Sequence, residues 1–232
     1  YSVGLADADV HGPNAPRLFG LHQESVKVDV RGVNAPRVPV VGRGALRVGS
    51  LGYFLEEQDT PVVWRDAYKH DYVHHMLGSF DWGVLDFLVI DMPPGTGNEL
   101  ITLADALKGC NTSALLVSSA DAIALQDSLK AARYCADTAM PVLGLVENYA
   151  GTVCPHCGGE FEMFPRAPEV EEFERQGIAT LARIPFTPQV GAAAAAGAPI
   201  AGEDESPLAQ TFVDLAYTCS RELIARQRTM ES

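Results

Sequence analysis

The fold of this chain is decided by one stretch, Leu85-Asp86-Phe87-Leu88-Val89-Ile90-Asp91-Met92-Pro93-Pro94-Gly95-Thr96-Gly97. Its first half is an apolar run that ends abruptly in a carboxylate, Asp91. An apolar run without polar alternation predicts a β-strand that is buried on both faces. Such strands are typical of parallel sheets covered by helices, so the stretch predicts an α/β fold.

Asp91 and the loop that follows it indicate a ligand site. Ligands of parallel sheets bind beyond the carboxyl ends of the strands, so Asp91 is expected to face a ligand crevice. The Pro-Pro-Gly-Thr-Gly segment can neither continue the strand nor start a helix at once, and its second half offers free backbone N–H groups. This combination suits a hydrated Mg²⁺ beside a nucleotide phosphate. The alternative is a buried Asp that caps the next helix.

Length and composition set the class of protein. The chain has 232 residues, of which 47% are hydrophobic, and residues 1–232 are predicted to form a single domain. The net charge of −13 and the lack of a basic stripe argue against a nucleic-acid partner. No apolar run approaches about 18 residues and no signal-peptide pattern is present, which predicts a cytoplasmic protein without a membrane partner.

Strand and helix patterns alternate along the chain, which predicts a doubly wound, mostly parallel sheet with helices on both faces. Strands are predicted at residues 1–6, 85–91, 112–118, 141–148 and 177–185. Helices are predicted from Thr60 onward and at residues 99–108, 121–139, 190–196 and 207–228. Three short β-like runs, at residues 26–30, 38–41 and 46–51, are expected to form a peripheral hairpin or an extra strand pair.

Asp7 and Asp9 lie in a loop after the first predicted strand, in residues 7–17. Two residues at positions i and i+2 of an extended chain point to opposite sides, so only one of these carboxylates can face a phosphate directly. The other is expected to hold a water molecule or the shell of a metal ion. The alternative is an Asx-rich turn with no ligand.

Cys154 and Cys157 are the only close pair among five cysteines. This usage favours a metal or redox pair in a reducing compartment over a disulfide framework. The glycines at 158 and 159 are expected to let backbone N–H groups turn toward the sulfurs. Because a zinc or iron–sulfur site usually needs four ligands, the other two thiolates are expected from a second copy across a two-fold axis. Zn²⁺ shared between two chains and a thiol–disulfide oxidoreductase remain alternatives.

Four segments together resemble a known family. They are residues 3–16 (VGLADADVHGPNAP), 82–97 (WGVLDFLVIDMPPGTG), 146–159 (VENYAGTVCPHCGG) and 183–186 (RIPF). The pattern is similar to that of the Mrp/NBP35 (ApbC) family of deviant-Walker P-loop ATPases, relatives of MinD and of nitrogenase iron protein. The resemblance implies an ATPase that carries an iron–sulfur cluster. It implies a [4Fe–4S] cluster held between two protomers by Cys154 and Cys157, in a loop at 148–165, and passed to apo-proteins.

The resemblance also implies roles at an ATP and Mg²⁺ site. Asp9 would place the attacking water or contact the metal shell, and Asp91 would be the Walker B-like carboxylate. The remaining implied contacts are Mg²⁺ through water for Asp7, the γ-phosphate for Gly95 and Gly97, and the adenine for Asn148 and Pro185.

One departure from the family pattern stands out. The family's phosphate loop is absent, since no Gly-x-x-x-x-Gly-Lys-[Ser/Thr] occurs in the chain. The first strand, this loop and the first helix are therefore predicted to be missing from the given sequence. Two other functions stay open. One is a non-catalytic zinc- or cluster-binding assembly module, and the other is a MinD-like positioning ATPase, against which the lack of a basic amphipathic C-terminal helix argues.

Overall fold

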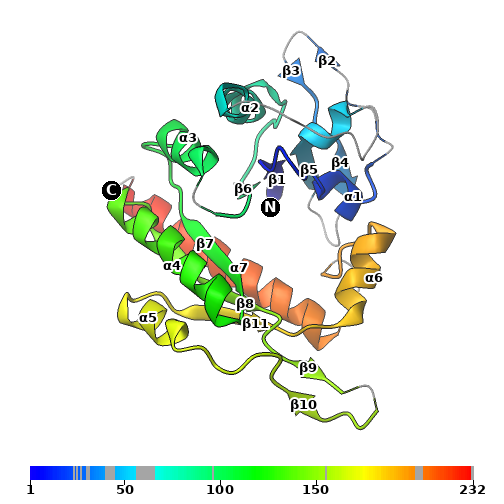
Figure 1. Ribbon diagram of the computed structural model, residues 1–232. Helices are drawn as coiled ribbons and strands as arrows, with labels where there is room; N and C mark the ends of the chain where they lie inside the picture. The colour runs from blue at the N-terminus through cyan, green and yellow to red at the C-terminus, as the bar shows by residue number, and fades with distance from the viewer. Residues whose placement is uncertain are drawn as a thin grey trace. The chain divides into compact units, whose positions relative to one another are not determined.

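The computed structural model describes residues 1–22, 24, 26, 28–29, 32–39, 45–55, 66–95, 97–154, 156–201 and 206–230 (Figure 1). The chain divides into two compact units, each described here by itself. Unit 1 comprises residues 1–106 and 191–203, and unit 2 comprises residues 107–190 and 204–232. The organisation of residues 1–232 as a single domain stays a prediction.

Unit 1 contains a four-stranded sheet in the order β4-β5-β1-β6. The central strand β1 (Ser2–Asp7) lies parallel to both β5 (Ala45–Ser50) and β6 (Phe87–Asp91), and β4 (Arg37–Pro39) is antiparallel to β5. The runs at 38–41 and 46–51 were expected to form a peripheral hairpin or an extra strand pair, and they form the antiparallel strand pair β4–β5. Strand β5 lies inside the sheet because Leu46 and Val48 pack against the residues of β1 and α1.

Side chains alternate between two core layers in unit 1. Leu5 and Val48 pack with Ala15 of the short helix α1 (Ala15–Leu18) on one face. On the other face, Ala6 packs with α2 (Asp66–Ser79) and Trp82. The smaller elements of this unit are β2 (Val28–Asp29), β3 (Gly32–Val33), the 3-10 helix η1 (Leu51–Phe54) and α3 (Asn98–Ala106).

The exposure of β6 corrects the prediction made for the deciding stretch. Leu88 and Ile90 pack against the core layer that holds Trp82, but Val89, which points the other way, is 52% exposed. In the described part of unit 1, β6 is the end strand of its sheet and pairs with β1 alone. The strand is therefore not buried on both faces.

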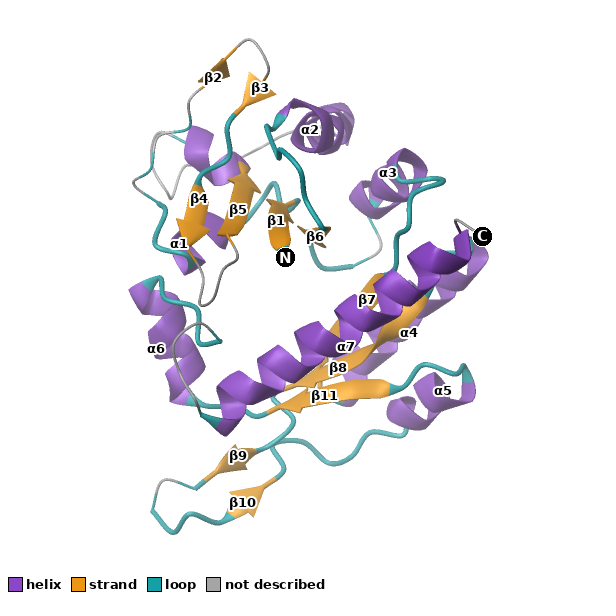
Figure 2. Ribbon diagram, turned by 180° about the vertical axis from the view of Figure 1, so that it is seen from behind, coloured by secondary structure: helices purple, strands orange, loops and turns teal. Residues whose placement is uncertain are grey.

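Unit 2 contains a three-stranded parallel sheet in the order β11-β8-β7. Its strands are β7 (Ala114–Ser119), β8 (Val142–Asn148) and β11 (Thr180–Ile184). Helix α4 (Ala122–Asp137), with α5 (Glu169–Arg175) beside it, and helix α7 (Pro207–Met230) lie on opposite faces of this sheet (Figures 1 and 2). Helix α6 (Pro188–Ala196) spans the boundary between the units.

The helix faces of unit 2 agree only in part with the sequence prediction. Leu125, Leu129 and Ala132 of α4 are buried as expected, whereas Ile123 is 76% exposed, since a residue two positions from Leu125 lies on a different face of the helix. Residues 56–65, which include the expected N-terminus of the helix from Thr60, lie outside the described part of the chain. Among the described residues, no helix has both the length and the apolar character needed to cross a membrane.

Candidate functional site

Three neighbouring parallel strands of unit 1 end in polar residues that lie side by side. Ser50 ends β5, Asp7 ends β1 and Asp91 ends β6, and the strand register pairs Asp7 with each of the other two. The backbone N–H of Ala8 donates to the carbonyl oxygen of Asp91 at 2.8 Å, which continues the pairing beyond the strand ends. This arrangement sets two carboxylates at the edge of the sheet where ligands of parallel sheets bind.

Asp7 is only 2% exposed, and it organises the loop that follows β1. One carboxylate oxygen, Oδ2, accepts hydrogen bonds from the Ser50 hydroxyl at 2.8 Å and the Ala15 N–H at 3.1 Å, and Oδ1 accepts from the Asp9 N–H at 3.2 Å. The Tyr72 hydroxyl donates to the carbonyl oxygen of Asp7 at 2.9 Å. Burial raises the pKa of Asp7, while the bonds from Ser50 and the two backbone groups act in the opposite direction.

Asp9 and Asp91 lie in more open positions than Asp7. Oδ1 of Asp9 accepts from the N–H groups of His11 and Gly12, at 3.0 and 3.1 Å, which is the Asx turn that the sequence left as an alternative. Partial desolvation and then the negative charge of Asp9 raise the pKa of Asp91. The raised pKa values of Asp7 and Asp91 indicate that negative charge is unfavourable at these strand ends. A bound divalent cation would stabilise the charged carboxylates.

A Mg²⁺ ion at these strand ends would need ligands beyond the carboxylates. Among the described residues, no three His, Cys, Asp or Glu side chains group closely enough to hold a metal ion by themselves. Mg²⁺ keeps several waters and usually takes one or two carboxylates together with phosphate oxygens. The carboxylate set of unit 1 fits that pattern and does not fit a closed protein cage.

The loop after Asp91 retains the open backbone that its sequence predicts. Gly95 has a φ of +94°, and a Cβ at this position would meet no atom within 4 Å. Gly97 precedes α3, and its carbonyl oxygen accepts from the Leu100 N–H at 3.1 Å. Thr96, between them, lies outside the described residues. The left-handed conformation of Gly95 is one that residues with side chains rarely adopt.

Asn148 and Pro185 lie next to each other at one edge of the sheet in unit 2. Asn148 ends β8 and pairs in register with Ile184, which directly precedes Pro185. The Asn148 side-chain oxygen accepts from the Tyr149 N–H at 3.0 Å. Tyr149 has a φ of +56°, unusual for a residue with a side chain, and its ring meets Phe186 edge-on at 5.6 Å. The polar strand end predicted for this unit is therefore present.

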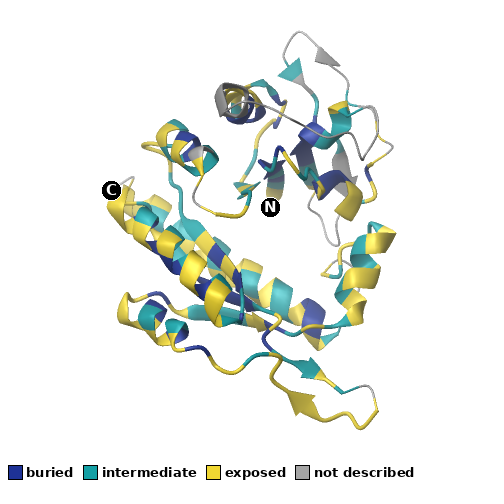
Figure 3. Cartoon of the chain, viewed as in Figure 1, coloured by how far each residue is buried: buried dark blue, intermediate teal, exposed yellow. Residues whose placement is uncertain are grey.

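Cys154 and Cys157 lie in the turn of a hairpin formed by β9 (Thr152–Val153) and β10 (Glu160–Phe161). The Cys154 N–H donates to the Gly159 carbonyl oxygen, and the Gly158 N–H donates to the Cys154 carbonyl oxygen, both at 2.9 Å. Gly158 has a φ of +72°, which closes the turn. The hairpin is largely exposed (Figure 3).

The surroundings of the Cys154 sulfur favour its thiolate form. Hydrogen bonds from the backbone N–H of Cys157 and then from that of His156 lower the pKa of Cys154. The glycines were expected to let backbone N–H groups turn toward the sulfurs, and the left-handed Gly158, whose own N–H bonds to the Cys154 carbonyl oxygen, gives the turn its shape. Cys154 follows a strand, whereas the thiol–disulfide oxidoreductase alternative requires a cysteine at a helix N-terminus.

The alkylation of Cys154 provides a direct test of this turn. Because its pKa is lowered, Cys154 is expected to react with iodoacetamide at a lower pH than a cysteine in a short unstructured peptide. Cys135, which is buried and whose pKa is raised by burial, is expected to react only at higher pH. Mass spectrometry of quenched samples over a pH series measures both midpoints. A Cys154 profile that coincides with that of the peptide would contradict the hydrogen-bonding pattern.

The structure adds polar residues that the sequence analysis did not select. Ser50 and Tyr72 hold Asp7 in unit 1, and Arg183 bonds to Glu147 and Glu162 in unit 2. Glu147 was detectable, since it is a charged residue within an otherwise apolar strand pattern. Ser50 and Tyr72 carried no local signal because only the pairing of β5 with β1 and the packing of α2 bring them to Asp7.

The predicted site residues form two groups. Asp7, Asp9, Asp91, Gly95 and Gly97 belong to unit 1. Asn148, Pro185, Cys154 and Cys157 belong to unit 2, where the hairpin leaves the sheet at the ends of β8 and β11.

Comparison with known proteins finds close relatives in sequence. The chain is 34% identical over 217 residues to an iron–sulfur cluster carrier protein of Saccharolobus solfataricus, covering 92% of this chain and 71% of the relative. It is 37% identical to a protein of the same description from Aquifex aeolicus and to the cytosolic Fe–S cluster assembly factor CFD1 of Mycosarcoma maydis. These matches cover 95% and 80% of this chain, but the chain spans only 59% and 51% of those relatives.

Solved structures and a family model agree with these relatives. A nucleotide-binding protein from Archaeoglobus fulgidus, solved in complex with ADP, is 29% identical, with a TM-score of 0.67 over 84% of this chain and 74% of its own. MinD of Pyrococcus horikoshii, at 20% identity and a TM-score of 0.57 over 93% of this chain and 81% of its own, supports the α/β P-loop NTPase fold alone. The model of the ParA-type NUBPL iron-transfer P-loop NTPases matches residues 1–219. The chain therefore belongs to the NUBPL iron-transfer P-loop NTPase family, as its motifs had indicated.

Proposed function

We propose that this protein is a nucleotide-dependent carrier of an iron–sulfur cluster, which it holds as a homodimer and delivers to apo-proteins. The observation that carries the proposal is the hairpin turn that brings Cys154 and Cys157 together, closed by the backbone hydrogen bonds Cys154 N–H to Gly159 and Gly158 N–H to Cys154 and largely exposed. Relatives described as iron–sulfur cluster carriers support this reading. The cluster is the cargo, and the hairpin is the part of the chain that would hold it.

The proposed dimer follows from the number of ligands. The other cysteines, Cys110, Cys135 and Cys219, lie on or beside helices of unit 2, outside the hairpin. No group of three metal-ligating side chains exists among the described residues, so the turn supplies two thiolates. A [4Fe–4S] cluster takes four cysteine thiolates, and a second copy of the same turn would complete the set with two-fold symmetry.

Anaerobic reconstitution with iron and sulfide tests the proposal. We expect a visible thiolate-to-iron absorption band, half a [4Fe–4S] cluster per chain, and conversion of monomer to dimer only when the cluster is bound. Native mass spectrometry reads mass and cluster content together. One Zn²⁺ per two chains without iron would favour the zinc-binding assembly module. A full cluster on a monomer would contradict the shared site.

We further propose that the strand ends of unit 1 contact the Mg²⁺ of a bound nucleotide. Burial and the nearby Asp9 make the negative charge of Asp91 unfavourable, and the loop at Gly95 leaves its backbone open. A Mg²⁺–phosphate group would supply a counter-ion for the carboxylates and acceptors for the loop N–H groups. Asn148 and Pro185 would contact the base. The chain contains no Gly-x-x-x-x-Gly-Lys-[Ser/Thr] motif, so hydrolysis of ATP is proposed only for a protein that supplies that loop.

The charge of Asp91 is expected to control how Mg²⁺ affects nucleotide binding. In the wild-type protein, Mg²⁺ should tighten the binding of ATP, whereas in Asp91→Asn the affinity should become about 10-fold less sensitive to Mg²⁺, since a metal ligand oxygen loses its charge. Isothermal titration of ATP with and without Mg²⁺ measures the difference. Asp81→Asn, an exposed carboxylate outside the strand ends, is the control and should behave as wild type. A chain that binds no ATP at all would favour the non-catalytic assembly module.

A further inference from the structure

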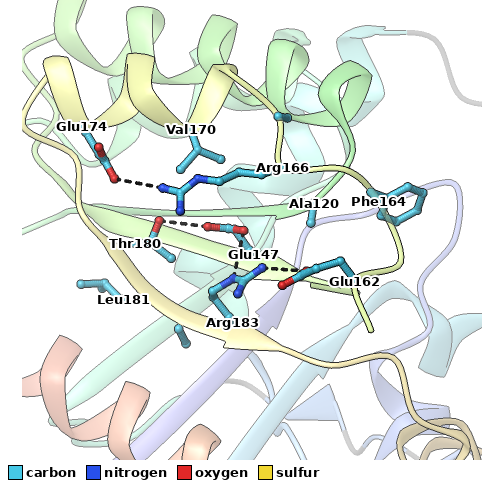
Figure 4. A pocket seen from close by; sticks show the side chains of 12 residues that line it. Ala120, Glu147, Glu162, Phe164, Arg166, Val170, Glu174, Thr180, Leu181 and Arg183 are labelled. Atoms are coloured by element: carbon cyan, nitrogen blue, oxygen red, sulfur yellow. Dashed lines mark hydrogen bonds and ion pairs between the residues drawn. The ribbon is translucent and has the colours of Figure 1, made fainter. Parts of the chain in front are cut away.

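Arg183 lies where the strand that ends in Asn148 meets the cysteine hairpin. On β11 it pairs in register with Glu147 of β8, the residue before Asn148. Its side chain lies in a cavity of about 340 Å³ in unit 2 (Figure 4). The polar residues that line this cavity are Glu147, Glu162, Arg166, Glu174, Thr180 and Arg183.

The Arg183 guanidinium joins three separate parts of the chain. Nε donates to Oε2 of Glu147 at 3.3 Å, at the end of β8. Nη2 donates to the Ala150 carbonyl oxygen at 3.2 Å, where the chain leaves the sheet, and to Oε2 of Glu162 at 3.0 Å, where it returns from the hairpin. Glu147 is 7% exposed and also accepts a hydrogen bond from the Thr180 hydroxyl at 3.2 Å, so the Glu147 carboxylate that binds Arg183 is held in place.

The two strands of the hairpin are attached to the sheet in different ways. The outgoing strand is held by backbone bonds from Ala150 N–H to the Ile184 carbonyl and from Phe186 N–H to the Gly151 carbonyl, at 3.0 and 2.7 Å. The Thr152 hydroxyl adds a bond to the Phe186 carbonyl at 2.8 Å. Among the described residues, the returning side of the hairpin is joined to the sheet by the hydrogen bond between Glu162 and Arg183.

We propose that Arg183 is a positioning residue that fixes the returning strand of the cysteine hairpin to the strand ending in Asn148, and so holds the Cys154–Cys157 turn in its metal-binding geometry. The inference rests on the proposed function where it concerns metal binding by the cysteine pair. Where it concerns the mobility of the hairpin, it rests on the hydrogen bonds alone. A shift at the end of β8 would reach the hairpin through this guanidinium.

The chemistry of the site favours arginine. Its planar fork donates in several fixed directions at once, which one ammonium group cannot reproduce while reaching three acceptors. Lysine would preserve the charge beside the buried Glu147 but lose part of the tie to Glu162. Arg183→Lys is therefore expected to rescue the stability of unit 2 while leaving the hairpin partly released.

Glu162→Ala is the most informative variant. It removes the tie to the hairpin and leaves the bond from Arg183 to the buried Glu147 in place, so the sheet should fold normally. Glu160→Ala is its matched control, because it removes an exposed carboxylate two residues away that does not bond to Arg183 in the described structure. Arg183→Gln removes all three bonds, and the double variant with Glu162→Ala tests whether the two residues act together.

Two readouts separate positioning from folding. The first is the release of Co²⁺ from the cysteine pair to a chelator, followed by thiolate-to-cobalt absorption. The second is amide hydrogen exchange of residues 150–162. In Glu162→Ala and Arg183→Gln we expect release and exchange to be about 10-fold faster, the low end of the range for groups that support metal ligands. The double variant should be no faster than Arg183→Gln, and Glu160→Ala should match wild type.

Each outcome has a distinct meaning. Unchanged exchange and release in Glu162→Ala would overturn the positioning role, as would equal effects of Glu160→Ala and Glu162→Ala. If wild type binds no Co²⁺ and no cluster, the proposed function fails, while the exchange measurement still decides whether Arg183 holds the hairpin. If Arg183→Gln does not fold, Glu162→Ala gives the result alone.

Discussion

Replacing both Cys154 and Cys157 with serine is expected to abolish retention of the iron–sulfur cluster. The thiolate is the metal ligand, and a serine hydroxyl stays protonated near neutral pH and binds iron poorly. Loss of supporting groups around a metal costs about 10- to 100-fold in affinity, so loss of two ligands should exceed 100-fold. Iron and sulfide content after anaerobic reconstitution and gel filtration gives the measurement.

The control for this variant is Cys110→Ser. Cys110 is an exposed cysteine outside the hairpin, so its replacement should leave cluster content and the dimer unchanged. The exposed position of the hairpin means that the double variant should fold like the wild type, which circular dichroism can verify. A double variant that still holds the same iron would show that the cluster binds elsewhere and would remove the basis of the proposed function.

Asp7→Ala is expected to give the largest loss of stability in unit 1, about 3 kcal/mol. The substitution leaves the Ser50 hydroxyl and the backbone N–H groups of Ala15 and Asp9 without their acceptor in a buried place, and each such group costs about 1–3 kcal/mol. The variant no longer buries the Asp7 carboxylate, whose burial destabilises the wild-type protein, and this offsets part of the loss. Denaturant unfolding monitored by tryptophan fluorescence is suitable, because Trp82 lies in the same core.

Asp7→Asn isolates the contribution of the charge. The folded-state pKa of Asp7 is raised, so its protonation contributes stability that is present below the ordinary carboxyl pKa and is lost as pH rises through the folded-state pKa. The asparagine variant does not titrate, so its destabilisation relative to wild type should be larger at pH 4 than at pH 7. A difference between the two proteins that is constant over this range, or larger at pH 7, would show that the carboxyl pKa is not raised. Asp127→Asn, an exposed carboxylate paired with Lys130, serves as control.

Elements that depend on local sequence patterns were predicted well, whereas the burial of individual residues was not. The strands at residues 1–6, 141–148 and 177–185 and the helices at 99–108 and 121–139 were found within a few residues of their predicted bounds. The loop predicted through residue 17 instead ends at Ala15, where helix α1 begins and its N–H reaches Asp7. Ile123 and Val89 are exposed although the sequence places both in the interior: Ile123 lies on a different helix face from Leu125, and Val89 belongs to β6, the end strand of the described sheet.

Local patterns in the chain were enough to establish the α/β class, the carboxylate Asp91 at the end of a strand, the cysteine pair and the family, because each depends on residues near one another in sequence. Tertiary structure alone decided that β5 lies inside the sheet and that Ser50 and Tyr72 hold Asp7. It also decided that Arg183 connects Glu147 to the hairpin. These contacts join residues 33 to 65 positions apart or, for Arg183 and Glu162, 21 positions apart, and only strand pairing and helix packing bring such residues within hydrogen-bonding distance.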